Sequence, residues 1–154
     1  MKPHTISNES QLNSNGRLVH LLGLKGLPKN QLEKILDVAD GLIGSKGNLQ
    51  KSKILRDMSV ANLFFEPSTR TRNTFEIAAK NLGCSVIGFD IASSSIEKGE
   101  SIYETVDALS LMGVDLCVLR HPESVIRDLA EYLPEMVFVN GGEGSISHPT
   151  QALI

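Results

Sequence analysis

Short apolar runs alternate along the chain with longer stretches in which apolar residues recur every three or four positions. An apolar run of four to eight residues is typical of a buried strand, and recurrence at helical spacing is typical of a helix with one covered face. This pattern predicts four strands, over 60–65, 85–89, 116–119 and 136–139. Each run is too short for a free-standing helix, so buried strands are expected.

Helical stripes lie between these runs. Gly83 and Gly113 each follow the last apolar residue of a stripe, where a left-handed residue commonly ends a helix. Pro28 and Pro149 stand where the first turn of a helix tolerates proline. Helices are expected over 29–43, from 68 to 82, over 102–112, over 124–133 and from 149 onward.

Strands that alternate with helices at this spacing predict an α/β fold with right-handed crossovers. We expect a four-stranded parallel sheet with helices on both faces, in one domain over 17–154. Residues 1–16 are polar and are expected to form a flexible tail. A mobile segment is also expected over 45–56, which has little to bury, and a polar loop is expected over 90–100.

The stretch after the first strand concentrates donors for an oxyanion. Pro67 ends the strand, and Ser68, Thr69, Arg70 and Thr71 then fall at the start of the next helix. A helix N-terminus offers unpaired N–H groups and partial positive charge, and arginine binds phosphate oxygens in bidentate fashion. The alternative is an ordinary helix cap beside solvated arginines.

Two further polar segments follow strands directly. Arg120 and His121 come after the third strand, and His148 and Gln151 come after the fourth. Ligands of parallel α/β sheets bind beyond the carboxyl ends of the strands. The two segments are therefore expected to converge with the oxyanion stretch at one edge of the sheet. An alternative for His148 is an ordinary cap or core histidine, and His121 is expected to be structural.

The composition of the chain indicates which binding partners and which cellular compartment to expect. The formal net charge of −3 argues against nucleic acid as the main partner, and no apolar run approaches the length that crosses a membrane. Cys84 and Cys117 lack metal-ligand spacing and are typical of a reduced pair in a cytoplasmic protein. We therefore expect no metal, no disulfide and no membrane or nucleic-acid partner.

Four segments in order resemble the aspartate and ornithine carbamoyltransferases. The first is FFEPSTRTRNTFEIAAKNLG, and the others are SSIEKGES, VLRHP and HPTQ. The Lys98-Gly99-Glu100 loop and the Arg120-His121-Pro122 run are more similar to the aspartate-using branch. The resemblance implies a Rossmann-like carbamoyl-phosphate domain, and it covers the chain from about Leu21 to its end.

The resemblance also implies roles for individual residues, and no cofactor. It assigns the phosphate to Ser68, Thr69, Arg70 and Thr71. The carbonyl oxygen is assigned to Thr71, Arg120 and His148, and the carbamoyl NH2 group to Gln151. The expected catalytic residues are Arg70, Thr71, Arg120 and His148. Ser94 and Lys98 are implied to reach a neighbouring subunit, so a homotrimer is expected.

The implied reaction transfers the carbamoyl group from carbamoyl phosphate to the amine of L-aspartate, in pyrimidine biosynthesis. The sequence stops at Ile154, before the expected aspartate-binding domain, so the fragment alone is expected to be inactive. Regulatory subunits are a further possible partner. Alternatives are an ornithine carbamoyltransferase domain and a non-catalytic anion-binding or assembly module. A nucleotide-binding domain is disfavoured because no Gly-x-Gly-x-x-Gly or Walker loop follows a strand.

Overall fold

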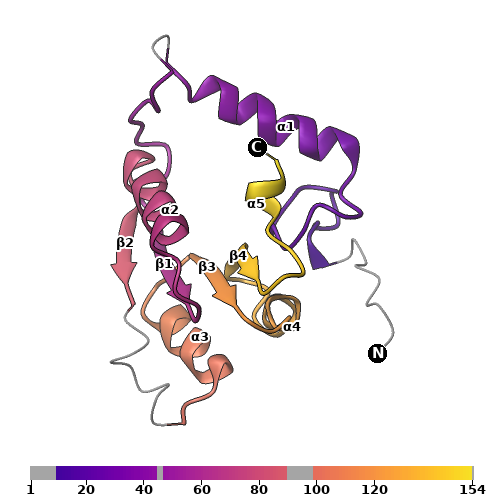
Figure 1. The fold of residues 1–154 in the computed structure, drawn as a ribbon, viewed down its shortest axis with the longest axis vertical. Coiled ribbons are helices and arrows are strands. Elements are labelled where there is room, and N and C mark those ends of the chain that lie inside the picture. The colour runs from indigo at the N-terminus through magenta and orange to yellow at the C-terminus, as the bar shows by residue number, and fades with distance from the viewer. Residues whose placement is uncertain (1–9, 45–46, 90–98, 154) are drawn as a thin grey trace.

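A computed structural model of the chain describes residues 10–44, 47–89 and 99–153. Within these ranges it contains nine helices and strands in alternating order after the first helix (Figure 1). They are α1 (Lys29–Gly41), β1 (Ser59–Phe64), α2 (Thr69–Asn81), β2 (Ser85–Gly88), α3 (Ile102–Leu111), β3 (Leu116–His121), α4 (Ile126–Tyr132), β4 (Val137–Glu143) and α5 (Pro149–Ala152). No helix among the described residues is long and apolar enough to cross a membrane.

The four strands form one parallel sheet in the order β2-β1-β3-β4, which confirms the predicted fold class. Helices α3 and α4 cover one face, and α2 covers the other face over β1 and β2 (Figure 1). Because β1 and β3 are central neighbours, the segments that follow them emerge side by side at the carboxyl edge. The register pairs Phe64 with Arg120 at that edge.

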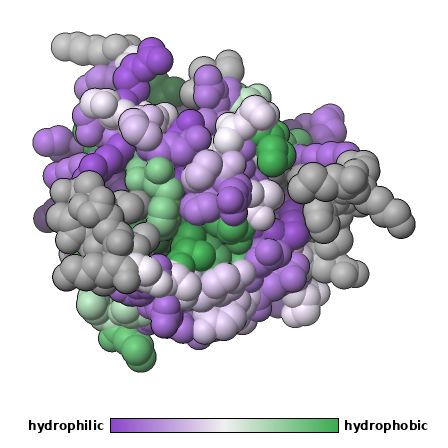
Figure 2. Space-filling model, turned by 60° about the horizontal axis from the view of Figure 1, so that its bottom comes forward, coloured by the Kyte–Doolittle hydropathy of each residue, from purple (hydrophilic) through white to green (hydrophobic). Residues whose placement is uncertain are grey.

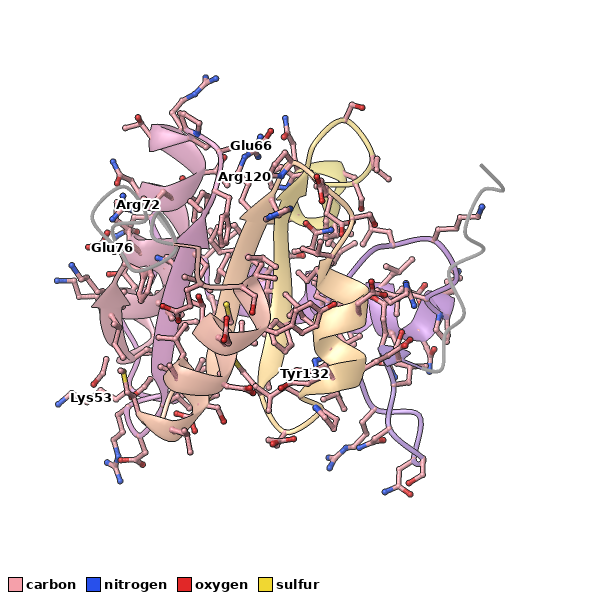
Figure 3. The ribbon with its side chains drawn as sticks, turned by 90° about the horizontal axis from the view of Figure 1, so that it is seen from below. Lys53, Glu66, Arg72, Glu76, Arg120 and Tyr132 are labelled. Atoms are coloured by element: carbon pink, nitrogen blue, oxygen red, sulfur yellow. The ribbon has the colours of Figure 1, made fainter. Side chains whose placement is uncertain are left out.

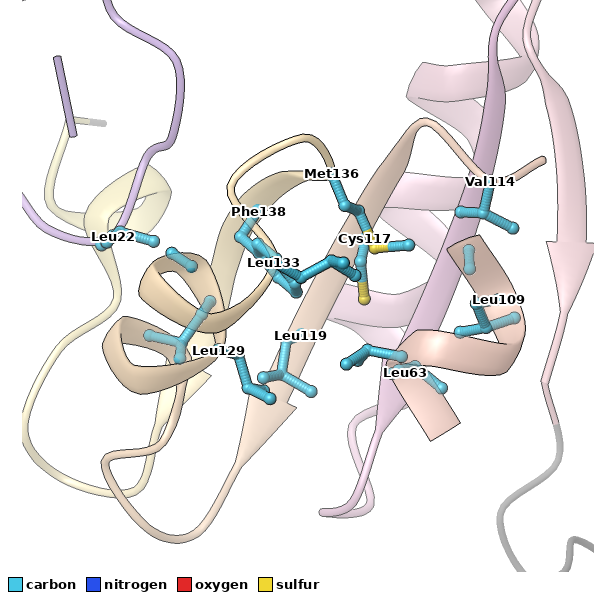
Figure 4. Packing of buried hydrophobic residues seen from close by; sticks show 14 residues of the cluster. Leu22, Leu63, Leu109, Val114, Cys117, Leu119, Leu129, Leu133, Met136 and Phe138 are labelled. Carbon is cyan, nitrogen blue, oxygen red and sulfur yellow. The ribbon is translucent and has the colours of Figure 1, made fainter. Parts of the chain in front are cut away.

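The core is divided by the sheet into two clusters of buried side chains. The larger one lies under α3 and α4, where Leu109 and Leu129 pack toward Leu63, Leu119 and Phe138 of the strands (Figure 4). The smaller cluster lies under α2 and contains Val60, Ala79, Cys84 and Val118. Strands buried on both faces explain why the sequence shows continuous apolar runs instead of alternation.

Two predicted helix ends are confirmed in detail. Gly83 and Gly113 follow α2 and α3 with φ of +93° and +84°, a region that favours glycine. A β-carbon on Gly83 would lie 3.1 Å from Lys53 Cα, so the end of α2 also packs closely on the segment before β1. That segment is part of the stretch expected to be mobile, yet Ser52 N donates to Asn81 O at 2.6 Å.

Three features differ from the sequence-based expectations. Strand β4 continues to Glu143, beyond the expected end at residue 139. The added residues include Asn140, Gly141 and Gly142, which give no apolar pattern in the sequence. Helix α1 buries none of its residues, although its periodicity predicted a packed face. Of the expected tail, residues 1–9 lie outside the described residues, whereas Gln11 is buried and its Oε1 accepts from Leu22 N at 2.8 Å. The packed region therefore begins before residue 17.

Apolar side chains also lie at the surface. Figure 2 shows one face on which hydrophobic residues form a small area surrounded by polar ones. Among the large apolar side chains of the described residues, Leu111 and Met112 have the highest exposed fractions, 89% and 73%. Both lie at the end of α3, away from the carboxyl edge of β1 and β3. They do not belong to the site described next.

Candidate anion-binding site

The N-terminus of α2 presents open donors at the carboxyl edge of the sheet. Ser68 is the N-cap residue, and its side chain makes no capping hydrogen bond within the described chain. The first N–H groups of α2 therefore lack the side-chain partner that usually satisfies them. Thr69 and Arg70 are exposed, and Thr71 is half-buried. Arg70 makes no ion pair with a described residue, so its guanidinium is available to a ligand.

Arg120 is the best-anchored cation at this edge. Its backbone oxygen accepts from Phe65 N at 2.8 Å, which joins it to the end of β1. Its side chain is only 20% exposed, and Nη1 donates to Gly141 O at 3.2 Å. Its Nε is buried and has no hydrogen-bond partner among the described residues. The side chain therefore has a fixed position and an unused donor.

Glu66 faces the same guanidinium (Figure 3). Its Oε2 lies 3.2 Å from Arg120 Nη2, within ion-pair distance. The two groups are not aligned as a hydrogen bond, since this oxygen accepts none from the described residues although it is buried. The Glu66 carboxylate thus lies where an anion would bind beside Arg120, and the Arg120 Nε donor still has no partner among the described residues. An incoming oxyanion would compete with Glu66 for this cation.

Gly142 allows the close approach of Arg120 to β4. Its φ is +129°, and a β-carbon there would collide with Arg120 Nη1. Its N–H donates to Asn140 Oδ1 at 2.7 Å, which fixes the peptide in place. Gly141 and Gly142 therefore form the surface against which Arg120 packs.

His148 lies close to Arg120 at the start of α5. Burial lowers the pKa of its imidazole, and the positive charge of Arg120 lowers it further. The ring is thus held neutral near neutral pH. Thr150 Oγ1 lies 3.3 Å from Nδ1, and a hydroxyl that donates there leaves the proton on Nε2. A neutral imidazole with one N–H can stabilise a developing oxyanion.

Of the other residues that the sequence analysis named, Gln151 and His121 are described by the structure. Gln151 is exposed on α5, and its N–H donates to His148 O at 3.1 Å. His121 packs edge-on against Phe65 at 4.8 Å between ring centroids, in agreement with a structural role. Ser94 and Lys98 lie outside the described residues.

The structure adds residues to the site that the sequence pattern did not assign. Gly141 supplies the carbonyl for Arg120, and Asn140 holds the peptide of Gly142. Glu66 adds a carboxylate that faces Arg120. Its position directly before Pro67 at the strand end was the one available signal. The contacts of Gly141 and Asn140 depend on backbone conformation, which no residue pattern encodes.

The two cysteines belong to the buried clusters on the two faces of the sheet. Cys84 and Cys117 are both free and buried, and burial raises the pKa of Cys117 to about 12. Its thiol is therefore protonated and poorly nucleophilic. Among the described residues, no cluster of three or more His, Cys, Asp or Glu side chains could hold a metal ion.

Comparison with known proteins places most of the chain in one family. Residues 19–154 match the model described as the aspartate/ornithine carbamoyltransferase, carbamoyl-P binding domain. The aspartate carbamoyltransferase catalytic subunit of Vesicomyosocius okutanii is 52% identical over 155 aligned positions, which cover 100% of this chain and 48% of the relative. The corresponding subunit of Ruthia magnifica is 50% identical with the same coverage. The chain spans about half the length of these relatives.

Solved structures agree with this assignment. The catalytic subunit of aspartate transcarbamoylase from M. jannaschii superposes with a TM-score of 0.76 at 41% identity, covering 88% of this chain and 44% of that one. Aspartate transcarbamoylase from Trypanosoma cruzi in complex with carbamoyl phosphate gives a TM-score of 0.77 at 29% identity, covering 87% and 43%. The same T. cruzi protein has been solved with carbamoyl phosphate and aspartate together.

Proposed function

Because the chain belongs to the family of carbamoyl-phosphate-binding domains of the aspartate and ornithine carbamoyltransferases, we propose that it binds carbamoyl phosphate at the carboxyl edge of its sheet. The observation that carries this proposal is the arrangement of Arg120. A largely buried guanidinium with an unused Nε donor lies beside a neutral imidazole and next to the strand that leads into α2. Such an arrangement suits a ligand with an anionic end and a carbonyl.

The two ends of carbamoyl phosphate require different donors. We assign the phosphate to the N-terminus of α2, with Ser68, Thr69, Arg70 and Thr71. The open N–H groups, the helix dipole and the Arg70 guanidinium all favour a dianion. Because arginine stays charged at any working pH, this half of the site does not depend on a titrating group.

The carbonyl half carries the chemistry. When an amine attacks the carbonyl carbon, a C–N bond forms and the C–O bond to phosphate breaks. Phosphate leaves with the electron pair of that bond, and the amine proton passes to the departing phosphate or to solvent. Negative charge develops on the carbonyl oxygen, where Thr71, Arg120 and His148 would donate. Each such donor contributes about 2.7–4 kcal/mol in comparable oxyanion sites. Gln151 would accept from the carbamoyl NH2 group and orient the carbon toward the amine.

We propose L-aspartate as the amine in the whole enzyme, as in pyrimidine biosynthesis. Both curated relatives reported above are aspartate carbamoyltransferase catalytic subunits, which supports this choice over ornithine. The 154-residue chain alone is expected to bind carbamoyl phosphate without turnover. Positioning the amine is a large part of the catalysis, and the chain spans about half the length of these relatives.

Assembly and compartment extend this proposal. Ser94 and Lys98 are proposed to complete the site of a neighbouring subunit in a homotrimer, with regulatory subunits as further possible partners. The resemblance of the SSIEKGES segment supports this arrangement. Two buried free cysteines favour a reducing compartment, and we therefore propose a cytoplasmic location.

The first test of this function is the Arg70→Ala variant of the chain. We expect it to fold and to lose measurable binding of carbamoyl phosphate, because charge-assisted hydrogen bonds contribute about 1.5–3 kcal/mol each. Binding is followed by phosphorus NMR of the ligand. Arg56→Ala is the matched control, since exposed Arg56 lies before β1 at the opposite end of the strand. Unchanged affinity in folded Arg70→Ala would remove Arg70 from the site.

A further inference from the structure

Glu143 is a buried carboxylate at the end of β4, directly after the glycines that contact Arg120. It is only 6% exposed. Its Oε1 accepts from Ser124 Oγ at 3.3 Å and from Ile126 N at 3.4 Å, and its Oε2 accepts from Asn140 Nδ2 at 3.4 Å. The Ile126 N–H and the Asn140 NH2 group can only donate, so both carboxyl oxygens of Glu143 act as acceptors here.

Charge and burial act on this group in opposite directions. Burial is the larger influence and raises the pKa of Glu143 above its ordinary value, while its hydrogen bonds and the positive charge of Arg127 limit this rise. Ile126 is the first residue of α4, and Val125 before it offers no side-chain cap. Glu143 therefore also serves as the cap of α4. This structural duty alone would explain a buried acid, so the rest of its network decides whether it does more.

The network continues from Glu143 toward Arg120. The Asn140 amide that donates to Glu143 also donates to Leu22 O at 2.9 Å, and its Oδ1 accepts from Gly142 N at 2.7 Å. These contacts define which end of the amide is nitrogen and prevent it from turning over. The adjoining Gly141 oxygen accepts from Arg120 Nη1 at 3.2 Å. The carboxylate is thus connected to the guanidinium through the Asn140 side chain and the single peptide group that joins Gly141 to Gly142.

The backbone of Glu143 holds the segment that leads to His148. Its N–H donates to Ser147 O at 2.9 Å, and its oxygen accepts from Ile146 N at 2.8 Å. These two bonds close the turn directly before His148. Arg120 and His148 therefore depend on the same anchored residue, although neither contacts its carboxylate.

We propose that Glu143 is a positioning residue, whose buried carboxyl group and backbone fix the 140–148 segment so that Arg120 and His148 hold the geometry that carbamoyl phosphate needs. This inference rests on the proposed function. A mere cap of α4 would affect stability and leave the Arg120 side of the segment unchanged. A positioning residue would alter Gly142, Arg120 and His148 together.

Glu143→Gln separates the two roles. The glutamine keeps an oxygen for Ser124 and Ile126, but its NH2 group faces the Asn140 NH2 group, which cannot turn over. We expect roughly tenfold weaker binding of carbamoyl phosphate, the size seen when supporting residues away from the ligand are changed. In NMR spectra the Gly142 amide resonance should shift. The pKa of His148 should rise toward its ordinary value as Arg120 moves away.

Two companion variants make the test decisive. Glu143→Asp keeps the carboxyl group with a shorter reach, and we expect changes in the same direction but smaller. Glu131→Gln, at an exposed position of α4, makes the same substitution and should leave all three readouts as in the original chain. Folded Glu143→Gln with unchanged affinity, Gly142 resonance and His148 titration would overturn the proposal.

Failure of this inference can be distinguished from failure of the proposed function. If the original chain does not bind carbamoyl phosphate, the proposed function fails, and the Gly142 and His148 signals still decide the role of Glu143. If Glu143→Gln does not fold, Glu143→Asp decides it. A shifted Gly142 resonance in that variant would support positioning, and an unshifted one would overturn it.

Discussion

At the scale of single residues, the site depends on Arg120, which donates to the Gly141 carbonyl and faces the Glu66 carboxylate. The carbonyl of Gly141 fixes the position of the guanidinium, while Glu66 offers a charge without hydrogen-bond alignment. A partly buried ion pair of this kind contributes little net stability, because desolvation offsets the attraction. Glu66 is therefore better understood as a competitor for the anion position than as a structural support.

Glu66→Gln should raise the affinity for carbamoyl phosphate by roughly three- to tenfold, since it removes both the competing carboxylate and its repulsion of an anionic ligand. The affinity is measured by titration at constant ionic strength. Glu76→Gln on α2 is the matched control, because that carboxylate pairs with Lys80 and not with Arg120. Equal or weaker binding by Glu66→Gln would show that Glu66 does not oppose the ligand.

At the scale of elements, two helix starts set the geometry around the site. Helix α2 begins without a side-chain cap, which leaves its N–H groups for a ligand. Helix α3 begins in the opposite way, with a complete capping box. Ser101 Oγ accepts from Glu104 N at 3.3 Å, and Glu104 Oε2 accepts from Ser101 N at 2.8 Å. This cap fixes where α3 begins.

Ser101→Ala should lower the free energy of unfolding by about 1 kcal/mol, the usual effect of losing such a cap. Urea denaturation followed by circular dichroism measures it. Ser101→Asn retains a capping oxygen and should lie within a few tenths of a kcal/mol of the original chain. A Ser101→Ala midpoint equal to that of the original chain would mean that the start of α3 is held by packing alone.

The elements were more predictable from the sequence than their contacts. Apolar runs and helical stripes located all four strands and five helices, because buried parallel strands and covered helix faces leave strong patterns. The extension of β4 to Glu143 was missed since Gly141 and Gly142 have no side chains to form a pattern. The exposed state of α1 was missed because periodicity identifies a face but not what covers it.

The candidate site was predictable to the same extent. The rule that ligands bind at the carboxyl ends of parallel strands correctly brought Arg120 and His148 to one edge. The support of Arg120 by Gly141, and of Gly142 by Asn140, could not be predicted. These contacts depend on the positive φ of Gly142 and on the orientation of one amide. The ligand roles of Ser68 to Thr71 and of Gln151 stay predictions.

At the scale of the whole molecule, the chain covers about half of its curated relatives. The proposed trimer adds the prediction that Lys98 acts in a neighbouring subunit. In the full-length enzyme, Arg70→Ala and Lys98→Ala should each be inactive as pure assemblies. Mixed assemblies should recover part of the activity, because some sites then combine an intact Arg70 with an intact Lys98. No recovery after subunit exchange, verified by mass, would contradict a shared site.

The central claim is that this chain alone contains a preformed cradle for carbamoyl phosphate. Calorimetric titration of the 154-residue chain with carbamoyl phosphate tests it most directly, at low salt so that weak anion binding is not screened. We predict saturable binding of one ligand per chain. Absence of binding to a chain shown to be folded would contradict the claim and would mean that Arg70, Arg120 and His148 do not form a site by themselves.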